Sequence, residues 1–259
     1  MTSEERRKRG TLLHAKHAFV PNSLGYCGPD DRGSILEHLH DSTVTPSLVG
    51  KLRAFEAAYP FIQLIATCNG KDVFDYPVPE AYWIGNDLLD NVPAENFYTF
   101  EHSKMPNRDP EEVRRLFGRA GALARPLHTF HVVSTFATSI VADGPNLTNV
   151  ATKKVEATVD NCRISWGEVK KVGRSTLVIE RQPLKFDGGI FKLAKPVLTA
   201  VRFDRQIAPF GGVGPGDLVS THWGFACEVL TSIQARNARK FTEADIKAVN
   251  LVLQSRGKR

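Results

Sequence analysis

The spacing of apolar residues along the chain changes near residue 160. Before that point apolar side chains recur three and four residues apart, as they do after Thr45-Pro46, where the threonine caps a helix and the proline takes its first position. This pattern predicts helices, including a buried one over residues 79–89 and another that begins at Asp109-Pro110. Beyond residue 160 the apolar residues alternate or form short runs between glycine turns, which is typical of strands.

The segments predicted as strands are residues 162–172, 175–182, 196–203 and 217–221. Gly173-Arg174 and Asp187-Gly188-Gly189 are candidate hairpin turns between them. About five short strands in roughly 70 residues favour a small barrel that is closed or nearly closed. Residues 231–253 return to helical spacing, either as one helix or as two with a break at residues 241–243.

We therefore expect an α+β protein, in which an N-terminal all-helical domain is followed by a small OB-like β-barrel with C-terminal helices. The expected divisions are a polar arm, a helical domain, a connector, and the barrel with its terminal helix, at residues 1–18, 19–145, 146–160 and 161–259. The first segment is assigned as an arm because most of its residues are polar or charged.

Composition is that of a globular protein, since 42% of the 259 residues are hydrophobic and 24% are charged. Much of the formal charge of +6 comes from basic residues at the two ends, with no aromatic residues between them. Such ends are more typical of solvated tails than of nucleic-acid sites, although an acidic partner surface is an alternative. The polar N-terminus and the lack of a membrane-length apolar run predict a cytoplasmic protein that does not bind membranes.

The four cysteines are too few for a disulfide framework and form no C-x-x-C zinc pair: Cys27, Cys68, Cys162 and Cys227. Cys27 lies in a loop rich in proline, asparagine and glycine, where glycines allow close approach of the backbone to a neighbour. A helix predicted to begin near Asp31 would lower the pKa of the Cys27 thiol. Alternatively, Cys27 is a small apolar residue that fills a tight turn.

Three histidines are candidates for chemistry. His222 ends the predicted strand that follows the turn Gly214-Pro215-Gly216-Asp217. His128 and His131 are three residues apart, so on a helix they share one face. That spacing suits a metal ion, but a polar pair facing a neighbouring helix or loop is the commoner reason for it.

The segment from Pro215 to Ala226 follows the pattern Pro-Gly-Asp-x-Val-x-x-His-x-Gly-Phe-Ala, and a helix is predicted after it. In this respect it resembles the HypC/HupF family of small nickel–iron hydrogenase maturation chaperones. Cys162, Gly167 and Val169 match more loosely the family's first motif, a cysteine followed by an apolar Pro-Gly stretch and a valine-rich strand. Here Cys162 is internal, whereas the family's cysteine becomes the N-terminal residue, and Trp166 stands where the family has proline.

This resemblance implies a small β-barrel and an accessory role in hydrogenase assembly rather than an enzyme. The family's cysteine is implicated in holding an iron centre that receives cyanide and carbon monoxide ligands. The resemblance places that role on Cys162, with His222 nearby, an Fe(CN)2CO-type precursor as cargo, and a hydrogenase maturation protein or large-subunit precursor as partner. The loop at residues 21–29 and the segment at residues 80–86 resemble a second bacterial family, which brings no known activity.

A thiolate at Cys162 and an imidazole at His222 suit a soft or borderline ion such as iron(II) or zinc. Cys27 and one of His128 or His131 would complete a mixed sulfur and nitrogen ligand set if the two domains face each other. The alternative is a cysteine-dependent or metal-dependent enzyme acting on a small molecule at the domain interface, with Cys27 or Cys162 as nucleophile. A structural module that docks a partner is a third hypothesis. Phosphate-loop, nucleotide, metalloprotease and Ser-His-Asp signatures are lacking, so nucleotide-driven or hydrolytic chemistry is not expected.

Overall fold

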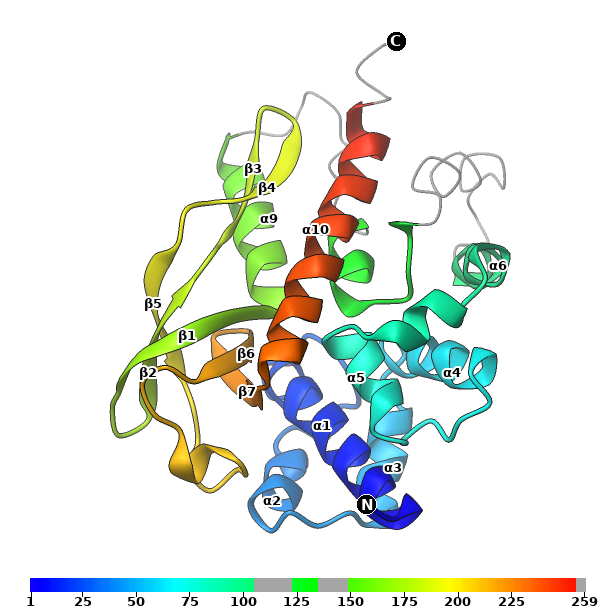
Figure 1. Ribbon diagram of the computed structural model, residues 1–259, viewed down its shortest axis with the longest axis vertical. Coiled ribbons are helices and arrows are strands. Elements are labelled where there is room, and N and C mark those ends of the chain that lie inside the picture. The colour runs from blue at the N-terminus through cyan, green and yellow to red at the C-terminus, as the bar shows by residue number, and fades with distance from the viewer. Residues whose placement is uncertain (105–122, 135–148, 255–259) are drawn as a thin grey trace.

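The fold is taken from a computed structural model, which describes residues 1–104, 123–134 and 149–254 (Figure 1). Its front part is helical, as the apolar spacing predicts. The elements are α1 (Ser3–Ser23), α2 (Ser34–His40), α3 (Pro46–Arg53), α4 (Tyr59–Cys68), α5 (Pro77–Trp83), η1 (Asp87–Asn91) and α6 (Ala94–Lys104). Residues 128–134 are also helical. The helix predicted to begin at Asp109-Pro110 lies outside the described residues.

The back part contains a closed five-stranded barrel with the strand order β1-β2-β5-β7-β6. Its strands are β1 (Ser165–Val172), β2 (Thr176–Arg181), β5 (Val197–Arg202), β6 (Leu218–His222) and β7 (Phe225–Leu230). β5 and β7 pair in parallel, while the other neighbours in the barrel are antiparallel. The expected α+β class, with helices followed by an OB-like barrel and a C-terminal helix, is therefore confirmed.

Between β2 and β5 the chain forms a separate hairpin of β3 (Leu184–Asp187) and β4 (Ile190–Leu193). Its turn is Gly188-Gly189, both with positive φ, as the candidate turn at this place predicts. The short helix η4 (Phe210–Gly212) lies in the connection between β5 and β6. The hairpin packs on α9 and α10, so it covers the helices that flank the barrel in sequence.

Two helices flank the barrel: α9 (Asn149–Cys162) leads into β1, and α10 (Ser232–Gln254) follows β7. The segment expected as a connector, residues 146–160, is therefore mostly part of α9. Cys162 is the last residue of α9 rather than the first residue of a strand. α10 is continuous, so the alternative with a break at residues 241–243 is wrong. The Phe241 ring packs against Gly85, where an added Cβ would lie 2.3 Å from the ring.

The polar arm expected at residues 1–18 is instead part of α1, and this expectation is wrong. Thr2 and Glu5 form a capping box at the start of the helix, and its later turns are buried. In Figure 1, α1 lies between β6 and β7 on one side and α5 on the other, and it packs against all three elements. A helix covered on both sides has no simple apolar stripe, which explains its polar appearance in the sequence.

The helical part and the barrel share one continuous apolar core. Polar contacts also join them, such as the partly buried ion pair of Lys16 with Glu228 and the 2.8 Å contact of His40 Nε2 with Asp204. Side chains at the junction are therefore held by both parts. Among the described helices, none combines the length and apolar character that a membrane crossing requires.

Candidate metal centre

Three potential metal ligands meet where the helical part joins the barrel. His128 comes from the helix at residues 128–134, Cys162 from the end of α9, and His222 from the end of β6. One nitrogen of each histidine and the cysteine sulfur all lie within 4.8 Å of one another. Residues 94 positions apart in the chain thus contribute to one cluster, which no local sequence motif contains.

His222 presents a free nitrogen to this cluster. Its Nδ1–H donates to the His17 carbonyl at 2.7 Å, which fixes the tautomer and leaves a lone pair on Nε2. Nε2 is buried and has no hydrogen-bond partner among the described residues. Burial lowers the pKa of His222 to about 4, although the backbone groups of His17 and Cys162 act to raise it. The ring is therefore neutral at physiological pH. A buried, neutral and unpartnered imidazole nitrogen is well suited to hold a metal ion.

His128 is held at both ring nitrogens. Its Nε2–H donates to the Cys162 carbonyl at 2.9 Å, and its Nδ1 accepts from the Tyr82 hydroxyl at 3.0 Å. Burial lowers the pKa of His128 well below its usual value, and the neighbouring His222 and His131 lower it further. Because a carbonyl only accepts, Nε2 must carry the proton. Nδ1 is therefore the nitrogen that a metal would use, in exchange for the Tyr82 hydroxyl.

The thiol of Cys162 is protonated in this environment. Burial raises its pKa to about 12, the charge of Cys27 adds to this effect, and the Trp223 indole opposes it. Such a thiol becomes a thiolate only when a cation replaces its proton. The cluster without metal is thus electrically neutral, and metal binding would release a proton.

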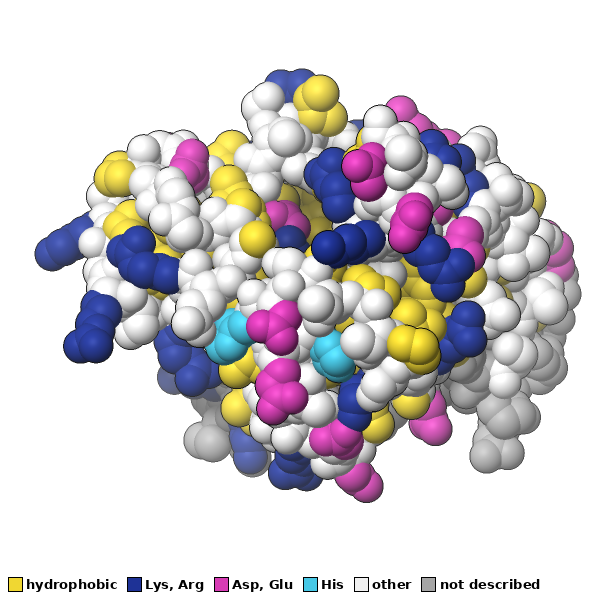
Figure 2. Space-filling view, turned by 90° about the horizontal axis from the view of Figure 1, so that it is seen from below, with side chains coloured by type: hydrophobic (Ala, Val, Ile, Leu, Met, Phe, Trp, Pro, Cys, Tyr) yellow, Lys and Arg dark blue, Asp and Glu magenta, His cyan; other side chains and the backbone are white. Residues whose placement is uncertain are grey.

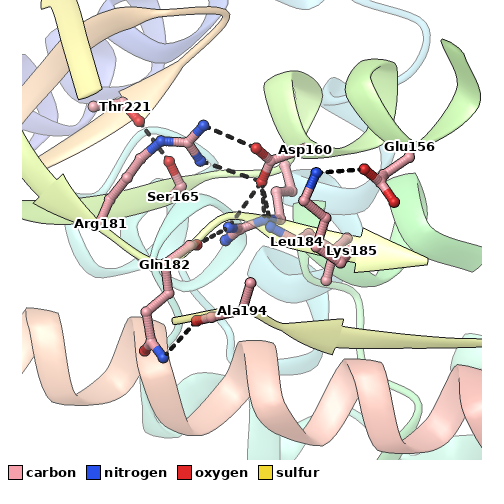
Figure 3. A network of polar contacts seen from close by, with 10 residues as sticks. Glu156, Asp160, Ser165, Arg181, Gln182, Leu184, Lys185, Ala194 and Thr221 are labelled. Atoms are coloured by element: carbon pink, nitrogen blue, oxygen red, sulfur yellow. Dashed lines mark hydrogen bonds and ion pairs between the residues drawn. The ribbon is translucent and has the colours of Figure 1, made fainter. Parts of the chain in front are cut away.

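A network around Asp160 holds the backbone on both sides of Cys162 (Figure 3). The Asp160 carboxylate accepts from the guanidinium of Arg181 at 2.8 Å, from that of Arg163 at 3.0 Å, and from the Leu184 amide at 2.7 Å. Burial alone would raise the pKa of Asp160, but these donors outweigh it, so the pKa is lowered. The Arg163 side chain is only 1% exposed. The end of α9 is therefore tied to β2 and β3.

A cavity of about 180 Å³ adjoins the cluster. Cys27 and His131 line it together with His128, Cys162 and His222, so all five candidate ligands surround one space. Cys27 and His131 do not belong to the group of three whose ligand atoms lie within 4.8 Å of one another. The remaining walls are mainly aromatic and aliphatic side chains, including those of Phe55, Tyr82, Trp83 and Trp223.

The expected lowering of the Cys27 pKa is wrong. Burial raises the pKa of this thiol, although the Gly28 amide acts in the opposite direction. The helix that follows begins only at Ser34, too far along the chain for its dipole to act on Cys27. The loop does bring the backbone close to a neighbour, because an added Cβ on Gly28 would lie 2.5 Å from the Phe55 ring, and the φ of Gly28 is 86°.

The chemistry of the three side chains fits a single transition-metal ion. Zinc–sulfur bonds of about 2.3 Å and zinc–nitrogen bonds of about 2.0 Å put tetrahedral ligand atoms about 3.3–3.7 Å apart. The widest separation of 4.8 Å in the cluster would shorten by about 1 Å on binding. Two nitrogens and one sulfur suit zinc, iron or copper, so the ligand set alone does not select the metal.

The sequence pointed to the five candidates but not to the residues that orient them. Tyr82 and Trp83 appear in the sequence as core aromatics, and both are fully or almost fully buried. Yet Tyr82 binds His128, and the Trp83 ring lies 4.6 Å from the His128 ring and 5.2 Å from the His17 ring. The only signal for Trp223 is its place beside glycine in the turn after His222.

The face of the molecule seen in Figure 2 has basic side chains mixed with acidic ones over most of its area. Apolar side chains lie between them in small groups. This mixture is typical of a solvated face rather than of a continuous basic track for a nucleic-acid backbone.

Comparison with known proteins identifies a family but no activity. The model of the family of unknown function DUF6390 matches residues 6–256, and the chain belongs to this family. The match spans most of the helical part, the whole barrel and all of α10, so the site lies wholly inside it. No curated protein and no solved structure matches the chain.

Proposed function

We propose that this DUF6390 protein binds one transition-metal ion through His128, Cys162 and His222. The observation that carries the proposal is the convergence of these three side chains within 4.8 Å, in a buried pocket where His222 Nε2 has no other partner. A buried polar atom without a partner costs free energy, and a metal ion would supply the missing interaction. The His17 and Cys162 carbonyls accept the hydrogen bonds that orient the two imidazoles.

The role that agrees best with this site is that of an accessory protein in metal-centre assembly in the cytoplasm. Three protein ligands leave at least one coordination position for an exogenous group, as in zinc sites that exchange ligands. The adjoining cavity of about 180 Å³ offers space for such a group. Iron(II) carrying small ligands such as cyanide and carbon monoxide is the proposed cargo, and the partner would be a hydrogenase maturation protein or a large-subunit precursor.

The residues behind the HypC/HupF resemblance support this assignment through their positions. The Pro215–Asp217 turn ties β1 to β6, since the Val169 amide donates to the Asp217 carbonyl at 2.8 Å and the Gly216 amide to the Val169 carbonyl at 2.9 Å. The same β6 carries His222 at its other end, and β1 follows Cys162 after two residues. The motif therefore joins the strand that carries His222 to the strand that follows Cys162.

A cysteine-dependent enzyme agrees less well with the environment. A nucleophilic cysteine needs a lowered pKa or a nearby base. Burial instead raises the pKa of both Cys27 and Cys162, and it lowers the basicity of His128 and His222. Fast reaction of a single cysteine with iodoacetamide near neutral pH, in metal-free protein, would favour the enzyme.

The decisive experiment is purification from iron-replete and zinc-replete cultures without oxygen, followed by metal analysis and infrared spectroscopy in the cyanide and carbonyl region. The wild-type protein should retain an equimolar amount of metal, and Cys162→Ala should lose it. Cys68→Ala is the matched control, because Cys68 is also partly buried but does not line the cavity. Equal metal content in wild type and Cys162→Ala would refute the site. Zinc instead of iron, with no infrared bands, would keep the site but refute the hydrogenase cargo.

A further inference from the structure

Trp223 has a backbone conformation that its side chain disfavours. His222 pairs with Phe225, so Trp223 and Gly224 form the two-residue turn between β6 and β7. Their φ angles are 51° and 70°. Turns of this kind strongly prefer Asn-Gly or Gly-Gly, because both central residues have positive φ. A bulky residue in this region is energetically unfavourable and is typically retained for a functional contact.

Neighbouring groups fix the position of the indole. The Trp223 amide donates to the Asn161 carbonyl at 2.8 Å, which ties the turn to the residue before Cys162. The Tyr26 ring stacks on the indole, with 4.3 Å between the ring centroids and 27° between the planes. Trp223 also lines the cavity together with Cys162 and His222. The bond to Asn161 and the stacked Tyr26 ring therefore hold the indole beside the candidate ligands.

The indole N–H is buried and has no hydrogen-bond partner among the described residues. A buried donor without a partner destabilises the fold. Trp223 lines the same cavity as Cys162, whose sulfur belongs to the cluster of three candidate ligands. A thiolate is a strong acceptor, whereas a neutral thiol is a weak one. A metal-bound thiolate at Cys162 would therefore give the indole N–H a strong acceptor.

We propose that Trp223 is a positioning residue for the metal centre, whose indole N–H donates a hydrogen bond to the metal-bound thiolate of Cys162. This inference rests on the proposed metal site. The bond orients the sulfur and withdraws electron density from it, so it weakens charge donation from sulfur to metal. The strained turn and the stacked Tyr26 ring keep the donor in place before the metal arrives, which reduces the ordering cost of binding.

The test is titration with cobalt(II), whose absorption reports coordination geometry and sulfur-to-cobalt charge transfer. Trp223→Phe keeps an aromatic ring against Tyr26 but lacks the N–H. A hydrogen bond to a charged group is worth about 1.5–3 kcal/mol, so this variant should bind cobalt(II) roughly 10- to 150-fold more weakly. Its charge-transfer band should move to lower energy, while the ligand-field bands remain those of the wild type.

Two further variants separate this role from a structural one. Trp223→Asn suits the turn better, so it should be at least as stable as the wild type and yet bind cobalt(II) more weakly. Trp166→Phe, in β1 and outside the cavity, is the matched control and should leave the spectrum unchanged. If wild type and Trp223→Phe show the same affinity and the same charge-transfer energy, the role of Trp223 is refuted and the metal site stands. If the wild type itself binds no cobalt(II), the metal site and this role fail together.

Discussion

Acid should destabilise this protein at a mildly acidic pH, because four histidines are buried without charge. Burial lowers the pKa of His14 to about 4, of His17 to about 3 and of His222 to about 4. Burial and neighbouring histidines lower the pKa of His128 well below its usual value. In the unfolded chain each ring titrates near pH 6.5. Their contribution to stability is therefore complete above pH 6.5 and is lost as the pH falls toward the folded-state pKa values.

The size of the loss follows from proton linkage. Between pH 7 and pH 5, each such histidine costs about 1.9 kcal/mol, because the unfolded chain binds a proton that the folded chain does not. Four of them together cost about 7.6 kcal/mol. Asp245 acts in the opposite direction, because burial raises the pKa of its carboxyl well above the usual value despite the charge of Arg125. Between pH 7 and pH 5, protonation of Asp245 adds at most about 2.7 kcal/mol to the free energy of unfolding. The net loss of stability is therefore about 5 kcal/mol.

Because typical domains have only about 5–15 kcal/mol of stability, the metal-free protein should unfold near pH 5. Urea denaturation of metal-free protein at pH 7, 6 and 5, followed by circular dichroism, would measure this loss. His14→Gln removes one titrating ring outside the metal cluster and keeps an acceptor for the Trp83 indole N–H, which now donates to His14 Nδ1 at 3.0 Å. This variant should lose about 1.9 kcal/mol less than the wild type over the same range. A free energy of unfolding that stays constant between pH 7 and pH 5 would refute the assignment of buried neutral histidines.

Three other predictions concern the site and its support. Asp160→Ala leaves the buried Arg163 guanidinium without its carboxylate, so it should lower the free energy of unfolding by about 3–5 kcal/mol. Calorimetry should show a melting temperature lower by roughly 6–20 °C. A shift no larger than that caused by replacing an exposed carboxylate would contradict this. Tyr82→Phe frees Nδ1 of His128 and should tighten cobalt(II) binding about 2- to 12-fold, since a neutral hydrogen bond contributes about 0.5–1.5 kcal/mol. Weaker binding would contradict this and would mean that the hydroxyl stabilises the bound metal. Because burial raises the pKa of Cys162 to about 12, the affinity for cobalt(II) should rise about tenfold per pH unit from pH 6.5 to 9. Competition with a chelator would measure this affinity, and a plateau above pH 8 would argue against a buried thiol.

The pattern of apolar residues predicted four of the five barrel strands, β1, β2, β5 and β6, to within a few residues, but β7 (Phe225–Leu230) was not among the predicted segments. β2, predicted at residues 175–182, spans Thr176–Arg181, and β6, predicted at residues 217–221, spans Leu218–His222. α1 also escaped prediction. Its buried residues include Thr11, His14 and His17, whose polarity indicates exposure in a sequence but is compensated here by contacts across the interface, such as that of His17 Nε2 with Ser220 Oγ at 3.1 Å.

The candidate site was predictable only in its residue types. The resemblance paired Cys162 with His222, and the structure brings these two together with His128. Which nitrogen of each ring a metal would use depends on partners that come from other elements, namely the His17 and Cys162 carbonyls. Contacts between elements that are far apart in sequence leave no periodic signal along the chain. The distinction between His128 and His131 therefore required the fold.

The same burial that makes the cluster suitable for a metal also limits how firmly it can hold one. Raising the pKa of Cys162 from 9.0 to about 12 adds about 4 kcal/mol to the cost of forming the thiolate, which is roughly a thousandfold in proton competition. The low dielectric strengthens the metal–sulfur attraction and the Trp223 N–H favours the thiolate, so both offset part of this cost. A site balanced in this way releases its metal when the thiol regains its proton. Such release is what the proposed role in metal-centre assembly would require.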